Sequence, residues 1–133
     1  MLIYLDANIV IYLIEQPAGW GTRASTYLTT LIAAGYTLVV SHLTRLECRV
    51  KPLAANQAVR LAQFDSFFRS SHVHLVGLPE AVFDRATAIR AAHRFRTADA
   101  LHLAAAIEAG CQRFLTNDIR LNSFTGLTVE VLP

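Results

Sequence analysis

The chain has a single lysine, Lys51, and the rest of its 12 basic residues are arginines. A Walker-type nucleotide site needs a glycine-rich loop that ends in Lys followed by Ser or Thr, but Lys51 is followed by Pro52. A phosphoacceptor receiver domain carries an aspartate after a strand and expects a lysine late in the chain, where this sequence has none. The scarcity of lysine therefore argues against both classes of protein.

Cysteine and long apolar runs are also scarce. Cys48 and Cys111 are too few and too far apart for a disulfide framework or a zinc knuckle. Apolar residues make up 53% of the chain, but charged residues interrupt every run before the roughly 20 residues of a membrane span. The N-terminus has no basic region ahead of an apolar one, so we expect no signal peptide and no membrane partner. We expect a cytoplasmic protein.

Charge and length set wide bounds on the function. The net charge of +2 and the pI near 8.8 permit a nucleic-acid substrate without requiring one. The 133 residues contain no linker, repeat or low-complexity tract. We therefore predict a single domain that spans residues 1–133. Its high mean hydropathy of +0.37 favours a sheet covered on both faces, together with an oligomer surface.

The chain begins with a strand pattern that stops at a carboxylate. Residues 2–5 are an apolar run without polar alternation, which is typical of a strand buried on both faces. Asp6 follows at once, and Asn8 is the predicted cap of a helix over residues 9–15. In open α/β sheets the groups beyond the carboxyl ends of the strands form the ligand crevice. Asp6 is thus either a helix cap or a catalytic or ligand-binding residue.

Strand and helix patterns alternate along the rest of the chain. The next helix is capped by Thr22 in this prediction, Ser41 opens another that Pro52 breaks or redirects, and Thr97 caps the last one. Alternation of this kind implies parallel pairing in a three-layer α/β/α domain with a central, mainly parallel five-stranded sheet. We predict the later strands over residues 37–40, 72–76, 113–116 and 127–132, and the other helices over residues 22–34, 41–51, 55–68, 79–92 and 97–110.

Parallel topology brings four acidic residues to one edge of the sheet. Asp6 follows the first strand and Asp118 the fourth, while Glu47 and Asp99 lie early in helices that follow strands or connectors. Each has an ordinary explanation, because the helix dipole favours an acid in the first turn by roughly 0.3–1 kcal/mol. Asp6 and Asp118 also suit caps and turns. Glu47 is the least easily explained in this way, since it lies beyond the first turn.

Taken together, the four carboxylates favour a cation site. Carboxylates crowded at one crevice repel one another unless a cation neutralises them. Oxygen ligands without neighbouring His or Cys suit Mg²⁺ or Mn²⁺. Such a cation would activate water and stabilise charge on a phosphodiester. The residues alone therefore predict a metal-dependent phosphoryl hydrolase.

A haloacid-dehalogenase-like phosphatase is the alternative enzyme. That fold requires Asp-x-Asp after its first strand, and here Asn8 occupies the second position, which removes the general acid. The late lysine of that pattern is also missing.

Four short motifs extend the prediction beyond the topology. In their order and spacing they resemble the PIN-domain ribonucleases, and they are most similar to the VapC toxins of VapBC toxin–antitoxin pairs. The resemblance covers essentially the whole chain. The motifs are Leu5-Asp6-Ala7-Asn8, Thr44-x-x-Glu47, Thr97-Ala98-Asp99-Ala100-Leu101-His102-Leu103-Ala104 and Leu115-Thr116-Asn117-Asp118.

The resemblance implies an endoribonuclease. Asp6, Glu47, Asp99 and Asp118 would hold one or two Mg²⁺ or Mn²⁺ ions. Polar side chains beside them would orient the acids or the attacking water, and the family places such residues at Asn8 and Thr116. Water would attack the phosphorus of tRNA or ribosomal RNA in line and leave a 5′-phosphate and a 3′-hydroxyl. The resemblance also implies a homodimer that a cognate VapB-like antitoxin inhibits.

The sequence departs from the family at Asn122-Ser123-Phe124, where many relatives carry a further acid, so no extra metal contact is expected there. A degenerate, catalytically inert scaffold that binds RNA or protein remains the alternative within the family. Two arginines precede Asp99, and they suit either phosphate binding or a solvated basic loop. These are Arg94 and Arg96.

Other residues have structural and functional interpretations. His102 lies three residues after Asp99, on the same helix face. We interpret it as a partly buried structural histidine rather than as a proton donor. Phe64, Phe67 and Phe68 share one predicted helix, and their aliphatic neighbours favour packing over base stacking. We predict that these three aromatic residues form the dimer or antitoxin surface.

Overall fold

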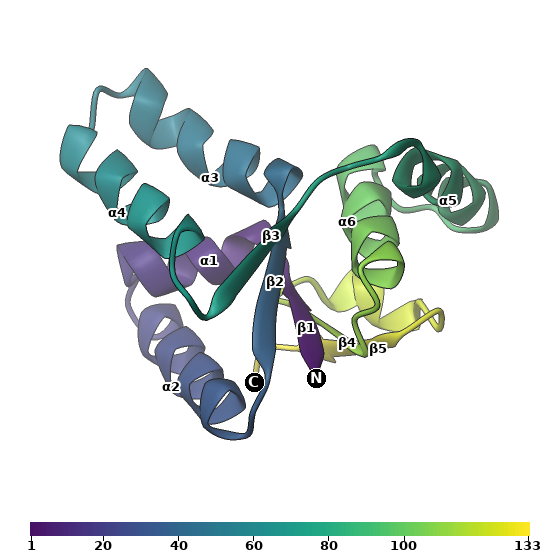
Figure 1. Ribbon diagram of the computed structural model, residues 1–133, viewed down its shortest axis with the longest axis horizontal. Helices are drawn as coiled ribbons and strands as arrows, with labels where there is room; N and C mark the ends of the chain where they lie inside the picture. The colour runs from purple at the N-terminus through teal and green to yellow at the C-terminus, as the bar shows by residue number, and fades with distance from the viewer.

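The computed structural model describes residues 1–133 and confirms the layered α/β prediction, with a five-stranded sheet between two groups of helices (Figure 1). The strands lie in the order β3-β2-β1-β4-β5, and every neighbouring pair is parallel. The elements are β1 (Leu2–Leu5), α1 (Ala7–Glu15), α2 (Trp20–Ala33), β2 (Thr37–Ser41), α3 (His42–Ala54), α4 (Ala58–Phe68), β3 (Val73–Val76), α5 (Glu80–Ala92), α6 (Thr97–Glu108), β4 (Arg113–Thr116), the 3₁₀ helix η1 (Ile119–Ser123) and β5 (Thr128–Val131).

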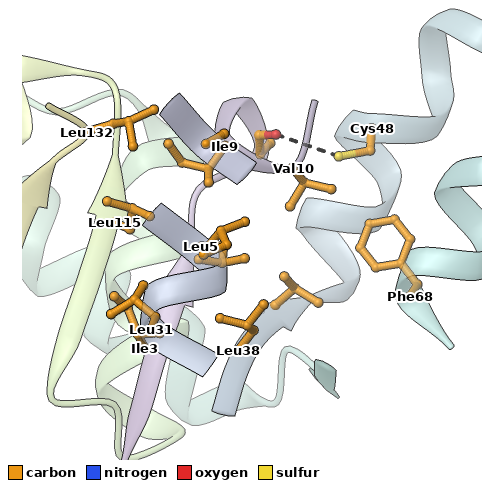
Figure 2. Close-up of a cluster of buried hydrophobic side chains, with 14 of the residues drawn as sticks. Ile3, Leu5, Ile9, Val10, Leu31, Leu38, Cys48, Phe68, Leu115 and Leu132 are labelled. Atoms are coloured by element: carbon orange, nitrogen blue, oxygen red, sulfur yellow. Dashed lines mark hydrogen bonds between the residues drawn. The ribbon is translucent and has the colours of Figure 1, made fainter. Parts of the chain in front are cut away.

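The apolar run of β1 is explained by its central position, because each face of this strand is covered. Ile3 and Leu5 face a core shared with α1, α2 and α4, whereas Tyr4 faces a second core shared with α5 and α6. In Figure 2 the first of these cores brings together strand residues such as Leu38 and Leu115, and the Cys48 thiol of α3 lies beside the backbone carbonyl of α1 that it contacts.

Several helix starts differ from the prediction. Asp6, not Asn8, caps α1, because its carboxylate accepts the Ala7 N–H and the helix begins at Ala7. The α2 helix begins at Trp20 after Gly19, whose φ of 82° favours glycine, so Thr22 lies within the first turn instead of capping it.

The prediction is right for one of the remaining helix boundaries and wrong for two others. Ser41 caps α3 as predicted, in a capping box with Thr44. Pro52 does not end α3, which continues to Ala54. Thr97 is the first residue of α6 and Arg96 is its cap residue, without a side-chain bond to the helix. Each error concerns one turn of the chain and leaves the order of the elements unchanged.

The predicted aromatic docking surface is wrong. Phe64 and Phe68 are buried in the first core, and Phe67 is partly buried against it. The outer face of α3 is apolar instead. Its residues Leu46, Val50 and Leu53 are 56–59% exposed and share one helix face, because their spacing is four and three residues.

The structure also bears on membrane insertion. None of the helices combines the length and the apolar content that crossing a bilayer requires.

Candidate active site

The parallel sheet places the four predicted acids beyond the carboxyl ends of its strands. Asp6 follows β1, and Asp118 follows the neighbouring strand β4 and caps η1. Asp99 lies in the first turn of α6, and Glu47 lies in the second turn of α3, directly after β2. Segments far apart in the sequence therefore supply the four carboxylates.

Asp6 is the most constrained of the acids. Its side chain is buried, with Oδ1 accepting the Ala7 N–H at 2.8 Å and Oδ2 accepting the Thr116 hydroxyl at 2.7 Å. The Thr116 hydroxyl oxygen also accepts the Asp118 N–H at 3.0 Å, so this residue joins the two aspartates. Burial raises the pKa of Asp6, and the facing His102 ring and the Thr116 hydroxyl oppose the rise.

Asp99 and Asp118 are paired with two arginines. Arg96 Nε lies 3.3 Å from Asp99 Oδ2, and the same guanidinium lies 3.9 Å from Asp118 Oδ2. Arg120 binds both oxygens of Asp118 and reaches Asp99 Oδ2 at 3.8 Å. Hydrogen bonds from Arg120 lower the pKa of the Asp118 carboxyl. Sequence reasoning missed Arg120, although its position two residues after Asp118 in a predicted turn indicated a local ion pair.

Glu47 faces a histidine instead of an arginine. The Nε2 atom of His102 contacts Glu47 Oε1 and lies 4.0 Å from Asp6 Oδ1. Nδ1 of the same ring is 2.7 Å from the Tyr4 hydroxyl. His102 is 1% exposed and thus more deeply buried than the partly buried residue that the sequence predicted.

The other predicted site residues lie nearer the surface. Asn8 is exposed, and its amide donates a hydrogen bond to Asn117 Oδ1 at 3.2 Å instead of contacting one of the four acids. Arg94 is exposed in the connector that leads to α6, and it forms no ion pair in this structure. The structure thus links Thr116 and Arg96 to the acids directly and leaves Asn8 and Arg94 beside them.

The chemistry of these donors fits a hard divalent cation. The four acids offer carboxylate oxygens, whereas both cysteine thiols are buried in the two cores, with Cys48 directed at the Ala7 carbonyl. No three acidic, histidine or cysteine side chains are grouped around a common point as a metal site. Positive charge from Arg96 and Arg120 instead lies against Asp99 and Asp118. A Mg²⁺ or Mn²⁺ ion would supply the same compensation to carboxylate oxygens.

Replacing Asp6 by asparagine is expected to stabilise the metal-free protein. Because burial raises the pKa of Asp6 above its unfolded value, the ionised carboxylate lowers stability as the pH rises through the window between the two pKa values. In chelator at about pH 7.5, the Asp6→Asn variant is expected to melt a few degrees higher than the wild type, since ~1 kcal/mol corresponds to roughly 3–5 °C for a domain of this size.

This difference in melting temperature should shrink as the pH falls and disappear below about pH 3, well under the ordinary aspartate pKa of about 3.9, where the carboxyl is protonated in both the folded and the unfolded wild type. Thermal melts followed by circular dichroism across this pH range measure it. Asp84→Asn, at an exposed position on α5, is the matched control. A lower melting temperature for Asp6→Asn at neutral pH would contradict the interpretation.

Comparison with known proteins places this architecture in a family. The PIN domain model matches residues 3–127. A comparison with curated proteins gave no match. Similar solved structures include VapBC2 from Rickettsia felis bound to a promoter DNA fragment, with a TM-score of 0.82 and 18% identity over 100% of both chains. DNA-bound VapBC from Salmonella typhimurium has a TM-score of 0.78 and 18% identity, also over 100% of both chains.

A third similar structure is the toxin VapC20 from Mycobacterium tuberculosis, which cleaves the sarcin–ricin loop. Its TM-score is 0.71 and its identity is 14%, with coverage of 94% of this chain and 98% of that chain. These neighbours are VapC toxins of VapBC systems, and at such low identity their likeness shows a shared fold. The family model, which covers nearly the whole chain, shows that this protein belongs to the PIN-domain family.

Proposed function

We propose that this PIN-domain protein is a metal-dependent endoribonuclease. One observation supports the proposal: four carboxylates from distant parts of the chain lie along the carboxyl edge of the sheet and share side-chain partners there. Family membership supports it, because the matched PIN model spans the segments that contain all four. Water would attack the phosphorus of an RNA phosphodiester in line, breaking the bond to the 3′ oxygen and leaving a 5′-phosphate and a 3′-hydroxyl.

The four acids have one shared role in this proposal. Asp6, Glu47, Asp99 and Asp118 would hold Mg²⁺ or Mn²⁺. When bound, the cation would lower the pKa of the attacking water and stabilise charge on the phosphate. Thr116 fixes the direction of the Asp6 carboxylate through its hydroxyl. We propose that Asn8, exposed two residues after Asp6, presents its amide to the water or the substrate.

Arginines would bind the RNA backbone beside the acids. Arg94 and Arg96 are exposed in the segment that leads into α6. Guanidinium groups match phosphate oxygens in charge and geometry. Once a cation neutralises the carboxylates, Arg96 would no longer be needed as their counter-ion and would be available to a phosphate of the substrate.

RNA cleavage should require both the cation and Asp6. Purified protein incubated with total tRNA and ribosomal RNA is expected to give discrete fragments with 5′-phosphates in Mg²⁺ or Mn²⁺, and none in chelator. Loss of one group that stabilises the transition state costs roughly 10²–10³ in rate, so Asp6→Asn is expected to be at least ~100-fold slower. Gel analysis of end-labelled RNA measures the rates.

Asp84→Asn should cut like the wild type, because this acid is exposed on α5, on a helix that contributes none of the four acids. Cleavage that persists in chelator or in the Asp6→Asn variant would contradict the proposal. A folded protein that neither cuts RNA nor binds Mn²⁺ would instead be the catalytically inert scaffold.

Arg94 and Arg96 should contribute to RNA affinity by binding phosphates. In the Asp6→Asn background with Mg²⁺, replacing either by glutamine is expected to weaken binding of single-stranded RNAs regardless of their sequence. The slope of log K against log salt should fall in magnitude by about 0.7 for each phosphate that the variant no longer neutralises. Fluorescence anisotropy at several salt concentrations tests this. Arg69→Gln, at an exposed residue after α4, is the control, and an equal decrease there would remove the assignment.

The same proposal leads to a protein partner and to an RNA target. VapBC2 from Rickettsia felis and a toxin–antitoxin complex from Klebsiella pneumoniae, with 21% identity and a TM-score of 0.70 over 98% of both chains, were solved as complexes. We propose a cognate VapB-like antitoxin for this chain by that analogy. VapC20 cleaves the sarcin–ricin loop, which supports ribosomal RNA as a target beside tRNA.

We further propose a homodimer and place its surface on the outer face of α3, where Leu46, Val50 and Leu53 form the exposed apolar stripe. Leu46→Ser with Val50→Ser is expected to shift the mass measured by light scattering from dimer to monomer. The control is Phe83→Ser, which replaces a 50% exposed aromatic residue of α5 and should leave the dimer intact. A wild-type protein that stays monomeric at all concentrations would overturn the homodimer.

A further inference from the structure

A closed chain of hydrogen bonds connects the start of α3 with Glu47, one turn further along the same helix. Tyr4 lies at the middle of β1 with 0% exposure, and its hydroxyl is 2.7 Å from Ser41 Oγ, 3.2 Å from Thr44 Oγ1 and 2.7 Å from His102 Nδ1. The opposite ring nitrogen of His102 contacts Glu47. Strand β1 and helix α6 thus supply one residue each to a bridge between two points of α3.

The direction of each hydrogen bond follows from counting hydrogens. Ser41 Oγ accepts the Thr44 N–H, and Thr44 Oγ1 accepts the Ser41 N–H, as the capping box requires. Both hydroxyls are fully buried, and the Tyr4 oxygen is the one further group that either contacts. Each must therefore donate its hydrogen to Tyr4, because a buried hydroxyl without an acceptor is costly.

The state of the histidine follows from this count. The Tyr4 oxygen uses both lone pairs on Ser41 and Thr44, so its own hydrogen points to His102 Nδ1. A nitrogen that accepts a hydrogen bond carries no proton. The ring hydrogen is therefore on Nε2, and that N–H donates to the Glu47 carboxylate.

We infer that His102 is a positioning residue, which holds the Glu47 carboxylate at the acidic edge through its Nε2–H and is itself oriented by Tyr4. The inference rests on the proposed function, in which Glu47 is one of the cation-binding acids. The inference also explains where the second ring nitrogen of His102 points. Tyr4 binds the first nitrogen, and the second one faces Glu47 and lies 4.0 Å from Asp6. A histidine that served only packing would not need to face the acids.

Glu47 is the acid that most needs such support. Its side chain is the longest of the four, and it is 34% exposed, compared with 12% for Asp6 and 10% for Asp99. It also has no arginine partner, unlike Asp99 and Asp118. A donor on a buried, oriented ring restricts its rotamers before a cation arrives, and groups that orient metal ligands typically change metal affinity by 10–100-fold.

Calorimetric titration with Mn²⁺ alone tests the inference without RNA. We expect His102→Leu to bind Mn²⁺ at least ~10-fold more weakly than the wild type. His102→Gln retains an N–H donor at the end of the side chain and should recover most of the affinity. His74→Leu, the same substitution at an exposed residue of β3, should bind like the wild type.

A double-mutant cycle separates positioning from a general effect on the fold. In a Glu47→Gln background, His102→Leu should change Mn²⁺ affinity by less than about twofold, because the group on which it acts is gone. Melting temperatures in millimolar Mn²⁺ extend the measurement to weak binders. A further tenfold loss in that background, or wild-type affinity in His102→Leu, would overturn the positioning role and leave the proposed function intact.

Nitrogen NMR of the metal-free wild type tests the position of the ring hydrogen directly, and the His102→Gln variant serves only to assign the resonances. The resonances that disappear in His102→Gln identify the ring, and we expect its hydrogen on Nε2. A hydrogen on Nδ1 alone would leave no donor toward Glu47 and would overturn the inference. A wild-type protein that binds no Mn²⁺ would overturn the proposed function and the positioning role with it.

Discussion

All five strands run in one direction, and this constraint determines where charge collects in the protein. The carboxyl ends of β1 and β4 are adjacent, so the residues that follow them, Asp6 and Asp118, must lie close together. The helices after β2 and before β4 add Glu47 and Asp99 to the same edge. Negative charge concentrated in this way has to be offset by positive charge or by hydrogen-bond donors, and each neighbouring side chain can be understood as part of that compensation.

The compensation divides the acids into two pairs. Guanidinium groups neutralise Asp99 and Asp118, and these arginines are exposed enough to leave when a cation or a phosphate replaces them. Glu47 instead contacts Nε2 of the buried His102 ring, and the same nitrogen lies 4.0 Å from Asp6 Oδ1. Burial raises the pKa of Asp6, so a cation at this edge would favour its ionised form.

The sequence was sufficient to predict the sheet and the edge of the sheet on which the four acids lie, because both depend on hydrophobic periodicity and topology. The strand over residues 113–116 was predicted to the residue. Helix caps were less predictable. Asp6 and Asn8 are both good cap residues, and Asp6 is the cap because its backbone is extended and the helix begins at Ala7. The burial of Phe64 depends on which face of α4 packs against the first core, and no local pattern contains that information. The contact of Tyr4 with His102 spans 98 residues, so no spacing rule reveals it.

Diffraction from crystals soaked in Mn²⁺, recorded at the manganese absorption edge, tests the central claim that the four carboxylates form a cation site. The account predicts anomalous density bounded by Asp6, Glu47, Asp99 and Asp118, with the side chains of Arg96 and Arg120 turned away from the aspartates that they contact without metal. Anomalous density elsewhere, or none at this edge while both arginines stay on Asp99 and Asp118, would contradict it.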